Sequence, residues 1–121
     1  MKDDERMSGI PFVPVARLGD IPAGQGRTYA VGDRLVAVFF DGISYAAIDD
    51  ICPHMGASLG SGPLRDGAVT CPWHAWRFRL SDGVWSDSSQ LKVDVFDVRI
   101  VGDTIEVRVP PAPPIALPQR P

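Results

Sequence analysis

Two short motifs lie near the middle of the chain, Cys52-Pro53-His54-Met55-Gly56 and Cys71-Pro72-Trp73-His74. The sequence contains 2 cysteines and 2 histidines, and all of them lie in these motifs. The span between the motifs is rich in glycine and small residues, so each Cys-His pair is expected on a loop. Thiolates and imidazoles together suit iron or zinc. The motifs therefore predict a metal site formed by Cys52, His54, Cys71 and His74.

The spacing C-x-H followed by C-x-x-H resembles the ligand motifs of Rieske [2Fe-2S] proteins. The resemblance includes Gly56 and the Cys-Pro-Trp-His form of the second motif, and it extends over roughly residues 11–109. It implies a [2Fe-2S] cluster with two cysteines on the buried iron and two histidines on the outer iron. By this resemblance, Cys52 and Cys71 bind the buried iron, and His54 and His74 bind the outer one.

Two other interpretations of the motifs stay open. A closed structural zinc site uses the same types of ligand, although its usual spacings are nearer C-x₂₋₄-C and H-x₃₋₅-H. Buried structural cysteines with unrelated histidines would produce the observed spacing only by chance. A zinc-binding module without redox activity is therefore the alternative to an iron–sulfur protein.

Strand signals precede the first motif. Residues 12–18 alternate loosely around Pro14, which predicts an edge strand because proline cannot donate a hydrogen bond to a neighbouring strand. After a loop at residues 19–26, further strands are predicted at residues 27–31, 34–40 and 43–49. The dipeptides Gly32-Asp33 and Asp41-Gly42 suit two-residue hairpins, so these three strands are expected to form an antiparallel meander.

Strands are also predicted around and after the second motif. The segments on either side of it are residues 68–71 and 76–80. In the second segment, Trp76, Phe78 and Leu80 alternate with two arginines, which predicts one buried and one solvated face. A turn is expected at Asp82-Gly83, followed by a polar run. A last hairpin is predicted from residues 92–101 and 104–109, joined by Gly102-Asp103.

These signals predict an all-β protein, because the predicted elements are short strands separated by turns. No amphipathic helix of ordinary length is predicted. The Rieske resemblance implies stacked antiparallel sheets, with a cluster-binding subdomain inserted at about residues 50–91. We expect the domain to cover residues 10–109. A disordered lead-in at residues 1–9 and a proline-rich tail at residues 110–121 are expected to flank it.

Composition restricts the location and the partners of the protein. The net charge of −3 is spread along 121 residues, which leaves no basic footprint for nucleic acid or anionic lipid. No apolar run is long enough to span a bilayer, and residues 1–6 lack the hydrophobic region of a signal peptide. Two metal-binding cysteines leave none for a disulfide, in agreement with a reducing compartment. We therefore expect a cytoplasmic protein without membrane or nucleic-acid partners.

The resemblance implies an electron carrier rather than an enzyme. Rieske oxygenases need a second iron held by two histidines and a carboxylate, and both histidines here are already assigned. A flavin or nicotinamide fingerprint is also missing from the sequence. The chain is similar to ferredoxins that carry electrons from a flavoprotein reductase to a terminal oxygenase. The alternative is the small subunit of a soluble nitrite reductase, bound to its large subunit.

The sequence departs from the Rieske pattern in ways that affect the cluster. Respiratory-type relatives join the two ligand loops by a disulfide, whereas Ala57 and Ala75 stand near those positions. A proline-containing loop covers the cluster in many relatives, whereas residues 86–90 contain no proline. High-potential relatives carry a serine and a tyrosine where this chain has Trp76 and Phe78. Without these hydroxyl donors we expect a low reduction potential, on the order of −150 mV.

Overall fold

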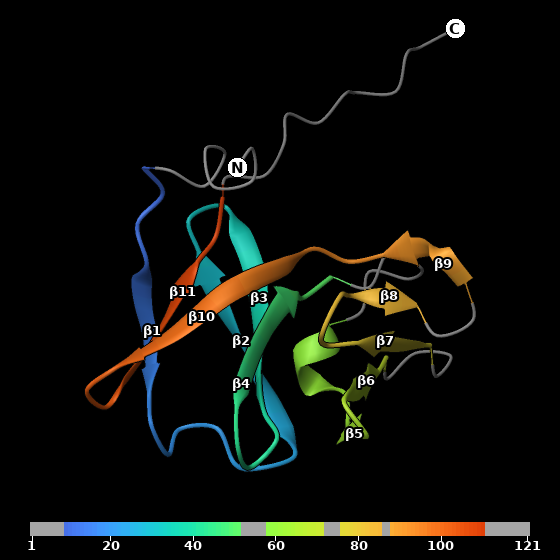
Figure 1. Cartoon of the computed structure of the whole chain (residues 1–121), viewed down its shortest axis with the longest axis horizontal. Coiled ribbons are helices and arrows are strands. Elements are labelled where there is room, and N and C mark those ends of the chain that lie inside the picture. The colour runs from blue at the N-terminus through green and yellow to red at the C-terminus, as the bar shows by residue number, and fades with distance from the viewer. Residues whose placement is uncertain (1–8, 52–57, 72–75, 86–87, 111–121) are drawn as a thin grey trace, which may run out of the picture.

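In the computed structural model, residues 9–51, 58–71, 76–85 and 88–110 are described, with the side chains of residues 88–91 left aside. The described residues form two antiparallel β-sheets that lie next to each other (Figure 1). The predicted all-β fold of stacked antiparallel sheets is therefore confirmed. The expected lead-in up to residue 8 and the tail from residue 111 lie outside the described residues, and the division into domains stays a prediction.

The larger sheet has six strands in the order β1-β11-β10-β4-β3-β2. The strands are β1 (Val13–Arg17), β2 (Gln25–Val31), β3 (Arg34–Phe40), β4 (Tyr45–Asp49), β10 (Val95–Val101) and β11 (Thr104–Arg108). β1 lies at one edge and pairs only with β11 in the ladder, with a bulge between Pro14 and Ala16. This position confirms the predicted edge strand, because both an edge and a bulge tolerate proline.

The smaller sheet is formed by the chain between β4 and β10, and its five strands follow sequence order. The strands are β5 (Leu64–Arg65), β6 (Ala68–Thr70), β7 (Arg77–Arg79), β8 (Val84–Trp85) and β9 (Ser88–Lys92). A short 3-10 helix, η1 (Leu59–Ser61), precedes this sheet and packs against β2 and β3 of the larger one. Figure 1 shows η1 between the two sheets.

The chain leaves the larger sheet and returns to it at adjacent points. The amide of Asp49, at the end of β4, donates to the carbonyl of Asp94 over 2.9 Å. The guanidinium of Arg34 contacts the carboxylates of both residues, at 3.2 Å from Asp49 and 2.9 Å from Asp94. It also lies over the ring of Phe96, 4.7 Å from the centroid. Arg34 therefore ties together the two connections between the sheets.

Strand β3 is buried on both faces, which explains its nearly continuous apolar sequence. Ala37 and Phe39 point into a core cluster shared with the smaller sheet. Val36 and Val38 point into a second cluster inside the larger sheet. The shared cluster contains Ala37, Phe39, Ile48, Leu59, Val69, Cys71, Phe78, Leu80 and Val93. The two sheets therefore have one common core, and it includes a predicted metal ligand.

Two strand boundaries differ from the predictions around β3. β2 begins at Gln25, so the predicted loop at residues 19–26 is too long, because Gln25 and Gly26 continue the ladder with β3. Gly26 suits this pairing, since a Cβ there would overlap the ring of Phe39. β4 begins at Tyr45, and the predicted two-residue turn at Asp41-Gly42 is wrong. The Asp41 carboxylate accepts hydrogen bonds from the amides of residues 43 and 44, both at 2.7 Å, which produces a longer turn.

The second half of the chain is divided more finely than predicted. The predicted strand at residues 92–101 consists of the end of β9 and the whole of β10, separated by Val93 and Asp94. Part of the polar run belongs to β9, which pairs with β8. The polar composition of this run did not predict a strand. The predicted turns at Gly32-Asp33 and Gly102-Asp103 are confirmed. No helix in the described residues has the length and the apolar character that crossing a membrane would require.

Candidate metal centre

The four predicted ligands are only partly covered by the structure. Cys71 is described, whereas Cys52, His54 and His74 lie outside the described residues. We call residues 52–57 the first ligand segment and residues 72–75 the second ligand segment. The residues on either side of each segment are described, so they determine where each segment starts and ends.

The ends of the first ligand segment are held together by backbone pairing. Ile51 and Ser58 form an isolated antiparallel bridge directly on either side of it. Beyond this bridge, the amide of Leu59 donates to the carbonyl of Asp50 over 2.7 Å. The segment therefore leaves β4 and returns to η1 at the same place. Cys52 lies directly after this pairing.

The second ligand segment is closed in a similar way. The amide of Cys71 donates to the carbonyl of Trp76 over 2.6 Å. The preceding pair, Thr70 and Arg77, is in register between β6 and β7. The segment therefore begins and ends at the tip of a hairpin. Cys71 is the first residue after β6, which fixes the start of the Cys-Pro-Trp-His motif.

Both closures rest on the core that the two sheets share. Leu59 follows the first closure, Cys71 begins the second, and both belong to the same buried cluster as Phe78. Cys71 is only 1% exposed. Gly62 brings η1 close to β6, because a Cβ at this position would overlap the carbonyl oxygen of Thr70. The residues that flank the two ligand segments therefore share one apolar core.

A buried carboxylate lies beside the first ligand segment, and sequence reasoning missed it. Asp50 is 1% exposed and is the one fully buried polar side chain among the described residues. Its Oδ1 atom accepts hydrogen bonds from Thr28 Oγ1 at 2.8 Å, Ser58 Oγ at 3.0 Å and Gly60 N at 2.7 Å. Asp49 and Asp50 are adjacent in the sequence, so the sequence alone did not indicate which of them is buried.

Trp76, the first described residue after the second ligand segment, stacks on Trp85 of β8. The rings of Trp76 and Trp85 stack with a centroid distance of 4.0 Å and an interplanar angle of 12°. Both are partly buried against the shared core, where Trp85 pairs in register with the fully buried Phe78. The predicted buried face of this strand is therefore confirmed. The stack adds apolar surface next to the Cys-Pro-Trp-His motif.

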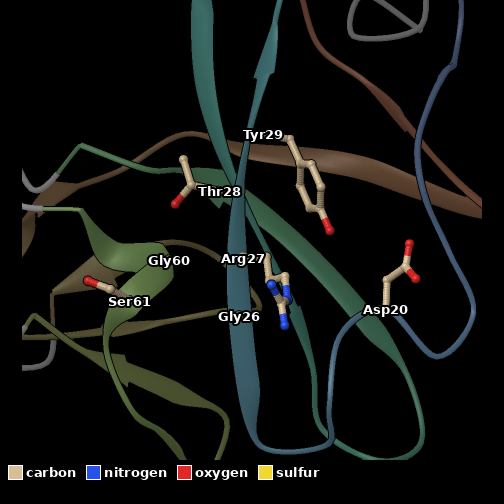
Figure 2. A pocket seen from close by; sticks show the side chains of 7 residues that line it. All are labelled: Asp20, Gly26, Arg27, Thr28, Tyr29, Gly60 and Ser61. Carbon is tan, nitrogen blue, oxygen red and sulfur yellow. The ribbon is translucent and has the colours of Figure 1, made fainter.

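A polar hollow of about 600 Å³ is lined by residues of β2 and η1, together with Asp20 (Figure 2). Its lining residues are Asp20, Gly26, Arg27, Thr28, Tyr29, Gly60 and Ser61. Thr28 points from β2 towards η1, whereas Tyr29 points towards the side where Asp20 lies. Burial, together with the nearby negative charge of Asp20, raises the pKa of Tyr29 above 10.0, so its hydroxyl stays protonated at neutral pH. Among the described residues that line this hollow, Cys71 is not present.

The described residues fit a metal cluster at the two ligand segments. Cys71 offers a thiol inside an apolar core, which suits an inner iron. In the sequence, Cys52 and His54 follow Ile51, and His74 follows Cys71. Within the described ranges, no group of three or more His, Cys, Asp or Glu side chains is arranged to hold a metal ion. The motif donors, three of which lie outside these ranges, stay a prediction.

Comparison with known proteins gives a consistent result. The Rieske [2Fe-2S] domain family matches residues 11–102. The ferredoxin component of the alkene monooxygenase system of Xanthobacter autotrophicus is 28% identical over 86% of this chain and 86% of its own length. Human apoptosis-inducing factor 3 is 35% identical over 78% of this chain. This chain spans only 16% of that human protein.

Solved structures show the same fold. The ferredoxin of carbazole 1,9a-dioxygenase from Nocardioides aromaticivorans is 31% identical, with a TM-score of 0.75 over 80% of this chain and 96% of that protein. A nitrite reductase small subunit from Mycobacterium tuberculosis, described as putative and NADH-dependent, has a TM-score of 0.77 over 84% of this chain and 97% of its own. Its identity is 24%, so this second similarity concerns the fold alone.

Proposed function

The chain belongs to the Rieske [2Fe-2S] domain family, and on this premise we propose that it is a one-electron carrier. We assign Cys52, His54, Cys71 and His74 as the ligands of its [2Fe-2S] cluster. The observation that carries this proposal is the pair of closures, Ile51 with Ser58 and Cys71 with Trp76. When bound, the cluster supplies reversible one-electron chemistry at a potential raised by its two neutral imidazole ligands.

The chain's own residues orient and shield the ligands. The core around Leu59, Cys71 and Phe78 excludes water from the inner side of the centre. The stacked Trp76 and Trp85 extend this apolar wall beside the second ligand segment. A low-polarity surround of this kind influences a redox centre by limiting its contact with solvent. The described residues thus provide a largely apolar surface beside the proposed cluster.

We assign the protein to an oxygenase system, between a flavoprotein reductase and a terminal oxygenase. Two similar proteins support this assignment: the alkene monooxygenase ferredoxin component, and the carbazole dioxygenase ferredoxin at 31% identity. The alternative, a small subunit bound to the large subunit of a nitrite reductase, is supported by fold similarity alone. In either case the chain acts as a cytoplasmic electron-transfer component and carries no catalytic centre of its own.

Spectroscopy on the purified protein tests the proposed cofactor. We expect a red-brown protein with two irons and two sulfides per chain. Reduction with dithionite should produce a rhombic electron paramagnetic resonance (EPR) signal with a low average g value. A colourless protein with one zinc per chain after anaerobic purification would replace the redox proposal with the zinc-binding alternative.

Reconstitution with partners tests the proposed pathway. The reduced protein should be reoxidised rapidly by a purified terminal oxygenase, and a flavoprotein reductase with NADH should reduce it again. It should also purify as a separate protein. Stable co-purification with a sirohaem subunit, without electron transfer to an oxygenase, would instead identify the nitrite reductase role.

A further inference from the structure

We propose that Asp50 is a positioning residue that locks the first ligand segment onto the larger sheet. This inference rests on the proposed ligand role of Cys52 and His54. It assigns to Asp50 and its donor Thr28 a function in cluster geometry, although neither residue is itself a ligand.

The backbone of Asp50 is fixed from both sides. Its amide donates to the carbonyl of Leu35 on β3 over 3.0 Å. Its carbonyl accepts the hydrogen bond from Leu59 at the start of η1 over 2.7 Å. Asp50 is therefore anchored between the larger sheet and the residues that follow the first ligand segment. Cys52 lies only two positions further along the chain.

The side chain of Asp50 brings three separate parts of the chain together at one oxygen. Thr28 belongs to β2, Ser58 ends the first closure, and Gly60 belongs to η1, and each donates to Oδ1 within 3.0 Å. A buried carboxylate is costly unless such donors satisfy it, and hydrogen bonds to a charged oxygen are short and strong. Each donor must therefore keep its place for the arrangement to remain stable.

Packing leaves little freedom in this arrangement. A Cβ on Gly60 would overlap Thr28 Oγ1 and would lie 2.9 Å from Asp50 Oδ1. The hydroxyls of Thr28 and Ser58 are themselves 3.1 Å apart. Figure 2 shows Thr28 directed from β2 towards η1. Ser58 and Gly60, which follow the first ligand segment, therefore cannot move away from Asp50 and Thr28 without breaking hydrogen bonds.

The two ligand segments differ in how they are anchored. The second is closed within the smaller sheet, by Cys71 with Trp76 and by the β6–β7 ladder. The first is tied to the larger sheet through Asp50 and Thr28. Asp50 therefore determines where the first Cys-His pair stands relative to the second pair. Loss of a donor to Asp50 should change the geometry of the centre before it changes the fold.

A matched pair of substitutions at Thr28 tests this inference in the holoprotein. Thr28→Val removes the hydroxyl and keeps the shape, whereas Thr28→Ser keeps the hydroxyl. We expect T28V to lose its visible absorbance to an iron chelator about fivefold faster than wild type, as loss of one hydrogen bond implies. Its EPR g values should also shift. T28S should behave as wild type in both measurements.

Thr104→Val on β11 is the control, because the Thr104 hydroxyl donates to Asp103 at 3.4 Å, in the turn between β10 and β11 and away from Asp50. A purely structural role for Thr28 would lower the melting temperature of T28V and leave its g values unchanged. That result, or equal chelator rates in T28V and wild type, would overturn the inference.

A second measurement separates this inference from the proposed function. Hydrogen exchange at the amides of Leu59 and Gly60 should accelerate severalfold in T28V, with Ser58→Ala as an independent variant. If wild type carries zinc or no metal, the electron-carrier proposal fails. The positioning role of Asp50 is then judged by exchange alone, and unchanged exchange in both variants would reject it.

Discussion

The amide nitrogen of Gly60 lies 2.7 Å from Oδ1 of Asp50, a residue ten positions earlier in the chain. Gly60 also lies so close to Thr28 of β2 that a Cβ at this position would overlap Thr28 Oγ1. Glycine is therefore needed at this position for space rather than for backbone flexibility. The tight approach also orders the residues that follow the first ligand segment.

Gly60→Ala should destabilise the protein. The added methyl group must displace Thr28 or Asp50, and overpacking of this kind costs about 1–3 kcal/mol. Chemical denaturation of the holoprotein should show the loss in free energy of unfolding. Ser61→Ala, at the next residue of η1, removes one exposed hydrogen bond, to the carbonyl of Ser58, and should change the stability less. Equal stability of the two variants would contradict the packing described for Gly60.

Replacement of a proposed ligand should abolish the cluster. Alanine at Cys52, His54, Cys71 or His74 leaves one iron with a missing ligand, and metal binding contributes to the order of the segments that hold it. Iron analysis and absorption spectra should show loss of the cofactor in all four variants. Met55→Leu, within the same motif, should keep it. Full cluster occupancy in H54A would show that the histidine assignment is wrong.

Arg34→Met should weaken the connection between the two sheets. The Arg34 side chain is 8% exposed, and its removal leaves the carboxylates of Asp49 and Asp94 close together. We expect a loss of about 2 kcal/mol, less than for a fully buried pair, because the Asp94 side chain is more than half exposed.

Arg108→Met provides the comparison for Arg34. Arg108 pairs with Asp97 at the surface, and loss of an exposed pair of this kind costs at most about 1 kcal/mol. Urea unfolding curves of both variants, measured at low and at high salt, distinguish the two cases. An equal loss of stability would show that the Arg34 contacts do not hold the connection between the sheets.

The sequence predicted strands correctly where its local signals agreed with the tertiary structure. β3 was predicted at Arg34–Phe40 because a clear turn precedes a long apolar run, and the structure buries both faces of that run. The start of β4 was missed because the Asp41 side chain caps the turn, and a hydrogen bond of this type leaves no trace in hydrophobic periodicity.

At the candidate site, sequence spacing identified the ligands but not the residues that support them. The Cys-His motifs are local, so they can be read directly from the sequence. Asp50 depends on Thr28, which is 22 residues away, and their contact exists only after β2 and η1 have packed together. A single sequence contains no signal for such a pair, because aspartate and threonine are both common in exposed turns and strands.

The turn after β3 should lose stability in acid. Hydrogen bonds from the amides of Ser44 and Ile43 lower the pKa of Asp41 below 3.8. Because the folded pKa is below the unfolded one, this contribution is fully present above pH 3.8 and disappears as the pH falls through the folded pKa. Asp41→Asn should therefore differ from wild type near neutrality and approach it in strong acid. A stability difference that is constant across this range would contradict the assignment.

Phe78→Tyr should raise the reduction potential, which we expect to be on the order of −150 mV in wild type and nearly independent of pH around neutrality. Phe78 is fully buried in the same cluster as Cys71 and lies four positions after His74. Reduction adds negative charge to the cluster sulfurs, so a tyrosine hydroxyl that donates to one of them stabilises the reduced form.

Phe96→Tyr is the matched control for this experiment, because Phe96 is also buried but belongs to the core of the larger sheet. Each new hydroxyl costs about 1–3 kcal/mol of stability if it finds no partner. Protein-film voltammetry and thermal unfolding should therefore separate the two variants: F78Y shifts the potential upward with little loss of stability, whereas F96Y loses stability at an unchanged potential. If F78Y instead behaves like F96Y, the ring of Phe78 does not face the cluster, and another feature of the centre sets its potential.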